Sequence, residues 1–203
     1  YGRYPIALVR GKGTRVWDAS GKSYIDFVSG LATDNLGHCN PNLVKAIRSQ
    51  AGRLLHVSNL YHIQPQSELA EELTLCSFAD KVFFCNSGAE ANEVLIKLAR
   101  LYGQARSGKD GKQYKSIASE HAFHGRTFGG MSATPIEKVQ GGFKPMLDGF
   151  NFGKFNDLDS FTALVDDQTA AILLEPIQGE EGINPCSQEF LRGIRKLCDD
   201  RGL

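Results

Sequence analysis

From residue 81 onward, short apolar runs alternate with segments of helical periodicity, and no other feature limits the possible folds so strongly. Three apolar runs are expected to form strands: residues 82–85, 116–118 and 170–174. Helical patterns are expected at residues 89–102, in a turn after Arg126, and in a last helix between Ser187 and Gly202. The run 170–174 is entirely apolar, as expected of a strand covered on both faces. The alternation predicts an α/β fold with a mostly parallel sheet flanked by helices.

The first 80 residues have a different pattern. Two short strands are expected at residues 14–17 and 23–27, because Asp18 and Gly21 favour a hairpin turn between them. Asn40 precedes a helical pattern and is expected to cap it. The remaining expected elements are a helix near residues 66–77 and glycine-containing loops at 105–112 and 140–156.

Composition excludes several classes of protein. The 203 residues are 41% hydrophobic, which is enough to bury a core, and 23 basic residues balance 23 acidic ones. This neutral balance gives no electrostatic case for binding nucleic acid or an anionic membrane. The five cysteines are scattered and odd in number, which favours free thiols in a reducing compartment. With no stretch of transmembrane length and no signal peptide at its start, the chain is expected to be cytoplasmic.

The sequence NSGAEAN at residues 86–92 joins an expected strand to an expected helix. A helix start has unpaired N–H groups and a positive dipole end, which together can hold a phosphate. Gly88 lets a ligand approach the backbone closely. The alternative is a capping box of Ser87 and Glu90 with no ligand at all, and taken alone this motif leaves both interpretations open.

A second motif, EHAFHGRT at residues 120–127, follows the next expected strand. Its aromatic ring, Phe123, can stack on a flat cofactor, and Arg126 can bind a carboxylate through two parallel hydrogen bonds. An ordinary surface loop remains the alternative. His121 and His124 suggest a metal site, which we reject because no third ligand has suitable spacing.

A third motif, EPIQGE at residues 175–180, follows the apolar run 170–174. Glu175 and Glu180 can orient an amine or pair with an arginine at the end of a strand. An ordinary strand-ending turn is the alternative here. Three strand ends that all carry polar groups are harder to explain as ordinary turns, because ligands of open α/β sheets bind beyond the carboxyl ends of strands.

These motifs resemble those of class III, ornithine-type aminotransferases, which depend on pyridoxal phosphate (PLP), and the resemblance extends over essentially the whole chain. The segments that carry it are residues 10–13, 17–18, 37–38, 58–61, 86–92, 123–127 and 175–180. The resemblance implies a fold-type I PLP-dependent transferase. It also implies an N-terminal segment, residues 1–59, that joins the small domain and the dimer interface. Residues 60–203 would be the front part of the large PLP-binding domain.

The resemblance also assigns roles to individual residues. Gly88 and Ala89, with Ser87 nearby, would hold the PLP phosphate, and Phe123 would stack on the pyridine ring. Arg126 would bind the α-carboxylate of the substrate. Glu180 would hold a C-terminal arginine, and Glu175 would support the residues that contact the substrate. The resemblance also implies a substrate-side tyrosine at Tyr1.

The implied reaction moves the terminal amino group of N²-acetylornithine to 2-oxoglutarate, in arginine biosynthesis, within a homodimer. Leu31 favours this substrate, because ornithine δ-aminotransferases carry tyrosine at that place and an aliphatic side chain leaves room for an acyl group. The alternatives are a class III enzyme acting on succinylornithine, ornithine or 4-aminobutyrate, and a non-catalytic fragment with the same fold.

Two parts of the family pattern are not found in the sequence. None of the twelve lysines lies in a context that matches the Schiff-base lysine, which we expect beyond Leu203 together with the aspartate that pairs with the pyridine nitrogen. No catalytic residue is therefore assigned within this chain, which is expected to be truncated at its C-terminus. The 203 residues by themselves are predicted not to catalyse transamination, because PLP chemistry needs that lysine.

Overall fold

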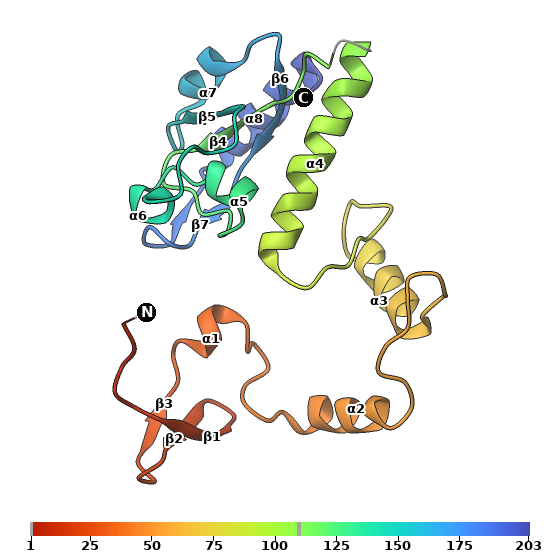
Figure 1. Cartoon of the computed structure of the whole chain (residues 1–203), viewed down its shortest axis with the longest axis vertical. Coiled ribbons are helices and arrows are strands. Elements are labelled where there is room, and N and C mark those ends of the chain that lie inside the picture. Colours follow the sequence, from red (N-terminus) through yellow and green to blue (C-terminus); the bar gives the residue numbers. More distant parts are fainter. Residues whose placement is uncertain (1, 109–110) are drawn as a thin grey trace. The chain divides into compact units, whose positions relative to one another are not determined.

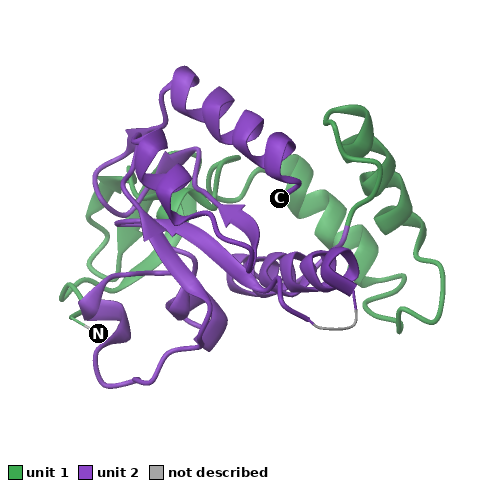
Figure 2. Ribbon diagram, turned by 90° about the horizontal axis from the view of Figure 1, so that it is seen from above, with its two compact units in different colours: residues 1–82 green, residues 83–203 purple. Residues whose placement is uncertain are grey.

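The computed structural model describes residues 2–108 and 111–203 (Figure 1). The chain forms two compact units, residues 1–82 and 83–203 (Figure 2). The domain boundary expected between residues 59 and 60 stays a prediction. In the described part of the chain, no helix has both the length and the apolar composition needed to cross a membrane.

The first unit contains a three-stranded antiparallel sheet and three helices. Its strands are β1 (Leu8–Lys12), β2 (Arg15–Asp18) and β3 (Ser23–Ile25), in that order. Its helices are α1 (Ser29–Ala32), α2 (Pro41–Ala51) and α3 (Gln64–Leu75). The predicted hairpin is confirmed, and Asp18 stabilises its turn by accepting hydrogen bonds from the N–H groups of Ser20 and Lys22. The predicted cap is also confirmed, since Asn40 accepts from the N–H groups at the start of α2.

The second unit is built on a parallel sheet. Its strands are β4 (Lys115–Ser119), β5 (Phe150–Gly153) and β6 (Thr169–Leu173), in the spatial order β5-β4-β6. A small antiparallel pair, β7 (Ile177–Gln178) and β8 (Asn184–Pro185), follows β6. The helices are α4 (Gly88–Ser107), α5 (Phe128–Ser132), α6 (Glu137–Gln140), α7 (Leu158–Leu164) and α8 (Gln188–Arg201).

Helices cover both faces of this sheet. Ile117 of β4 is fully buried in a core with Phe161 of α7 and Phe190 of α8. The two phenylalanine rings meet edge to face, with centroids 5.4 Å apart. Successive strand residues point to opposite faces, and Ser116, next to Ile117, lines a groove with α4. The predicted α/β fold with a parallel sheet flanked by helices is confirmed.

The sequence-based interpretation was wrong in two segments. Residues 82–85 were expected to form a strand but pair with no strand in the described part of the chain. An apolar run becomes a strand only where another strand offers hydrogen bonds. The expected loop 140–156, by contrast, contains a strand: β5 forms there because it can pair with the edge of β4. Four residues, FNFG, are too short for periodicity to indicate a strand.

Candidate active site

Two loops meet at the carboxyl ends of neighbouring parallel strands. One follows β4 and the other follows β6, so both leave the same edge of the sheet. The Gln178 side chain, which is 2% exposed, donates a hydrogen bond of 2.8 Å to the carbonyl oxygen of Glu120. A carboxylate oxygen of Glu175 accepts one of 2.9 Å from the N–H of Phe123. The second and third sequence motifs therefore lie in one site.

The first turn of α4 carries a capping box and two free donors. Ser87 caps the helix by accepting from the N–H of Glu90 at 3.2 Å, and the Glu90 carboxylate accepts from the N–H of Asn86 at 2.6 Å. Within the described residues, the N–H groups of Gly88 and Ala89 donate no hydrogen bond. A Cβ atom added to Gly88 would have no neighbour within 4 Å. The capping box thus leaves two N–H groups free, and free N–H groups at the positive end of a helix suit a phosphate.

Helix α4 also holds the loop that follows β4. The Asn92 side chain donates to the carbonyl oxygen of His124 at 2.9 Å, and Glu93 accepts from the N–H of Gly129 at 3.0 Å. Gly125 has a φ of 114°, and a Cβ there would lie 3.3 Å from the Cα of Ala89. Close approach to the first turn of α4 therefore requires glycine at position 125.

This loop brings together the two side chains expected to contact cofactor and substrate. Phe123 is half-buried and Arg126 is exposed. The guanidinium carbon of Arg126 lies 5.8 Å from the centroid of the Phe123 ring, in cation–π contact. An aromatic face and a free guanidinium thus share one short loop, and Gly125 between them lies against the start of α4.

Glu175 connects the two loops, while Glu180 remains on the surface. The Glu175 carboxylate accepts hydrogen bonds from the N–H groups of Phe123 and Gly179. Burial raises the pKa of Glu175 above its ordinary value, these hydrogen bonds act to lower it, and the nearby charge of Glu180 raises it further. Glu180 is exposed and forms no ion pair with an arginine in the described ranges.

Removing the Glu175 carboxylate is expected to loosen the loop that carries Phe123. Glu175→Ala leaves the N–H groups of Phe123 and Gly179 without their acceptor, at a cost of about 1–3 kcal/mol in the free energy of unfolding. Glu175→Gln keeps an acceptor oxygen and is expected to cost less than half as much. Urea unfolding of the intact protein measures both, and equal losses for the two variants would contradict this role.

His124 lies in the same loop as Phe123, and its burial was not predicted from the sequence. Its side chain is 3% exposed, and its Nε2 atom is buried without a hydrogen-bond partner among the described residues. Its backbone N–H donates to Thr134 Oγ1 at 2.8 Å. Burial lowers the pKa of His124 to about 4, so the ring is neutral at pH 7. His121, three residues earlier, is exposed and lies 4.0 Å from Glu181.

The buried ring is expected to make the protein sensitive to acid. Because the pKa of His124 is about 4 in the folded state and about 6.5 in the unfolded state, the unfolded state binds the proton first as pH falls. The free energy of unfolding should fall by about 3 kcal/mol between pH 6.5 and pH 4 from this group alone. In urea titrations at several pH values, His124→Asn should flatten this dependence, whereas the exposed-site control His121→Asn should not. Parallel curves for wild type and His124→Asn would refute the prediction.

The sequence analysis also singled out two residues of the first unit. Leu31 lies in the first unit, in α1, and its side chain is 80% exposed. Tyr1 lies outside the described residues. Asn92, Glu93 and Thr134, which hold the Phe123 loop, were not predicted, because their role depends on which helix the loop meets.

Comparison with known proteins agrees with these motifs. The family model for aminotransferase class III matches residues 1–203. Acetylornithine aminotransferase from Caldanaerobacter subterraneus is 52% identical over the whole chain, which covers 51% of that protein. The chain spans about half the length of the curated relatives it matches.

Solved structures give the same result. N-acetylornithine aminotransferase from Stenotrophomonas maltophilia matches with a TM-score of 0.82 and 40% identity, over 100% of this chain and 50% of that one. Ornithine aminotransferase from Toxoplasma gondii, in a structure with PLP at partial occupancy in its active site, matches with a TM-score of 0.93 and 30% identity, over 100% and 48% of the two chains. With the family model matching from end to end, this chain belongs to the class III aminotransferases.

Proposed function

We propose that this chain is the N-terminal half of a PLP-dependent enzyme that moves the terminal amino group of N²-acetylornithine to 2-oxoglutarate, in arginine biosynthesis. One observation carries the proposal: the free N–H groups of Gly88 and Ala89 lie beside the loop that bears Phe123 and Arg126. The curated relatives named acetylornithine aminotransferase support the choice of substrate.

The residues present fit the cofactor. Gly88 and Ala89, with Ser87 as the helix cap, would hold its phosphate, and Phe123 would cover a face of its ring. Bound PLP supplies an electron sink at the substrate carbon. Glu175 accepts from the backbone N–H of Phe123, so the backbone that carries the aromatic ring is held before the cofactor arrives.

The substrate would be held by its α-carboxylate. Arg126 is exposed, so its planar guanidinium is free to form two parallel hydrogen bonds with a carboxylate. A substrate held at that end presents its far amine to the cofactor, which selects a terminal amine over an α-amine. Glu180 is exposed on the neighbouring loop. It would form an ion pair with an arginine from the other half of the protein, and this ion pair would break when 2-oxoglutarate binds.

The lysine that binds the cofactor covalently would come from the other half of the protein, as would the acid that faces the pyridine nitrogen. We further propose a homodimer, located in the cytoplasm. The fold boundary between a small-domain segment, residues 1–59, and the cofactor domain, residues 60–203, belongs to the same proposal.

Ornithine is the second candidate substrate, favoured by the structural similarity to ornithine aminotransferase. The two are separated by competition between acetylornithine and ornithine at equal concentration, with the intact protein, PLP and 2-oxoglutarate. We expect kcat/KM for acetylornithine to exceed kcat/KM for ornithine by at least about tenfold. A hydrophobic contact that only one of two substrates makes changes kcat/KM by about that factor. A preference for ornithine, or no transfer from either donor, would reject the proposed reaction.

A further inference from the structure

One face of helix α4 holds the loop that follows β4. Asn92 and Glu93 come three and four positions after Ala89, so the three side chains lie on the same side of the helix. The Asn92 side chain donates to the carbonyl oxygen of His124 at 2.9 Å, and a Glu93 oxygen accepts from the N–H of Gly129 at 3.0 Å. Both bonds end on backbone atoms of the loop, so they fix the course of the chain there.

Arg126 lies between the two points at which the helix holds this loop. His124 precedes Arg126 by two positions, and Gly129 follows it by three. Between these points Gly125 packs on the helix, since a Cβ there would lie 3.3 Å from the Cα of Ala89. The backbone that carries Arg126 is therefore held close to the first turn of α4 from both sides.

The loop has no room to move closer to the helix. A Cβ added to Gly129 would lie 2.6 Å from the Glu93 carboxylate. One added to Gly130 would lie 2.5 Å from the carbonyl oxygen that Asn92 binds. Close packing blocks movement toward α4, and the two hydrogen bonds oppose movement away from it.

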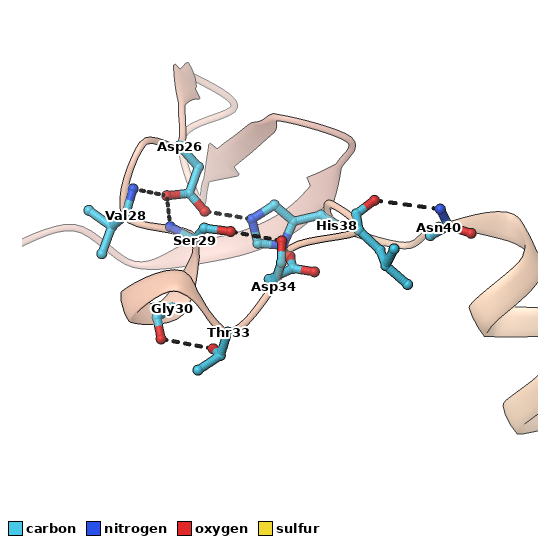
Figure 3. Close-up of polar contacts among 9 residues, drawn as sticks. Asp26, Val28, Ser29, Gly30, Thr33, Asp34, His38 and Asn40 are labelled. Atoms are coloured by element: carbon cyan, nitrogen blue, oxygen red, sulfur yellow. Dashed lines mark hydrogen bonds and ion pairs between the residues drawn. The ribbon is translucent and has the colours of Figure 1, made fainter. Parts of the chain in front are cut away.

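These contacts differ from the polar contacts that stabilise a single turn of the chain. In the first unit, Asp26 accepts from the N–H groups of Val28 and Ser29, two and three positions further on (Figure 3). Those bonds stabilise only the turn that contains them. Asn92 and Glu93 instead bind backbone groups 32 and 36 positions away. A contact over that sequence distance fixes two segments relative to each other, here the start of α4 and the loop that follows β4.

In the proposed function these two segments bind opposite ends of the reacting pair. The N–H groups of Gly88 and Ala89 hold the cofactor phosphate, and Arg126 holds the α-carboxylate of the amine donor. The distance between the helix start and Arg126 then decides how long a donor must be for its terminal amine to reach the cofactor. A misplacement of about 1 Å can reduce the rate about 100-fold.

We propose that Asn92 and Glu93 are positioning residues that select the length of the amine donor. They hold the loop of Arg126 at a fixed distance from the start of α4. A donor with three methylene groups between its α-carbon and its terminal amine, as in acetylornithine, then fits better than one with two or four. This inference rests on the proposed function. Because neither side chain has to touch the reacting atoms, their loss should change which donor is preferred more than how fast the chemistry proceeds.

The test compares N²-acetylornithine with N²-acetyl-2,4-diaminobutyrate, which is one methylene shorter, and with N²-acetyllysine, which is one longer. The measured quantity is the ratio of kcat/KM for acetylornithine to kcat/KM for each homologue, with the intact, PLP-loaded protein. Asn92→Ala and Glu93→Ala each remove one hydrogen bond, and α4 should persist because alanine is the best helix former. Glu93→Gln is the conservative variant, since its amide oxygen can still accept from Gly129.

Arg100, on the same helix, provides the matched control. Its side chain donates to the carbonyl oxygen of Asp148 at 2.8 Å, so it also connects α4 to a distant backbone segment, 48 positions away. Arg100→Ala should keep both ratios within about twofold of wild type. Titration of the cofactor-free variants with PLP gives a second measurement that needs no turnover. The Kd for PLP should stay within about threefold of wild type in every variant, because the N–H groups of Gly88 and Ala89 are unchanged.

We expect the wild type to prefer acetylornithine to each homologue by at least about tenfold, since one methylene changes kcat/KM by about 10- to 200-fold. Asn92→Ala and Glu93→Ala should each reduce at least one ratio by about fivefold or more, and Glu93→Gln should keep both ratios within about twofold. A merely structural role would lower kcat/KM for all three donors together. Ratios within twofold of wild type in an alanine variant overturn the inference for that residue, and an equal change in Arg100→Ala overturns it for both.

The wild-type protein separates this inference from the proposed function. Transfer from acetylornithine with no preference for its length would overturn the inference and leave the proposed function standing. Transfer from none of the three donors would reject the proposed function, and this inference with it.

Discussion

Replacing Arg126 with alanine is expected to lower kcat/KM for the amine donor by about 100-fold or more, while the Kd for PLP stays within about threefold of wild type. Two charge-assisted hydrogen bonds to a carboxylate are lost together, and each contributes roughly 1.5–3 kcal/mol. Arg126 is exposed and forms no ion pair with an acidic side chain in the described segments, so its removal should leave the fold intact. Steady-state kinetics and a PLP titration of the cofactor-free protein measure the two quantities.

Two variants refine this experiment. Arg126→Lys keeps the positive charge without the planar fork, and should recover only part of the lost activity. Arg192→Ala removes another exposed arginine, on α8, and should behave as wild type. If Arg126→Ala retained full kcat/KM for acetylornithine, the carboxylate-binding role would be rejected.

Replacing Gly88 with proline should raise the Kd for PLP by roughly 10- to 100-fold, which corresponds to the loss of one charge-assisted hydrogen bond of about 1.5–3 kcal/mol. Proline removes the N–H at this position, yet it is well tolerated as the first residue of a helix. Ser87, which precedes it, has φ −157° and ψ 161°, the extended conformation that proline requires of its neighbour. An added Cβ also has open space, since nothing lies within 4 Å of it at Gly88.

The second helix with a serine cap provides the control. Gln188 is the first residue of α8, and the Ser187 before it is extended, with ψ 149°. Gln188→Pro therefore makes the same change at an equivalent helix start outside the site. PLP titration followed by absorbance should give a wild-type Kd for this variant. Equal Kd values for Gly88→Pro and wild type would exclude the helix N-terminus as the phosphate site.

Local sequence signals predicted much of the fold. The caps Asn40 and Ser87 were predicted from the sequence, because a cap depends only on residues within one turn of the helix. The parallel strands β4 and β6 were read from apolar runs, because a strand buried in a sheet must be apolar. The same local signal failed for residues 82–85 and for β5, since pairing depends on a partner strand far away in the sequence.

The candidate site divides in the same way. The sequence by itself selected the groups to which we assign the chemistry: the N–H groups of Gly88 and Ala89, the ring of Phe123, the guanidinium of Arg126 and the acid Glu175. Each of these properties belongs to a residue type and its immediate neighbours.

Only the tertiary structure decided how these groups are held together. Glu175 and Phe123 are 52 positions apart and meet through a hydrogen bond, as do Asn92 and His124, 32 positions apart. The burial that lowers the pKa of His124 likewise comes from packing. Burial and long-range hydrogen bonds depend on which elements become neighbours in space, and that is a property of the folded chain, which no single stretch of sequence contains.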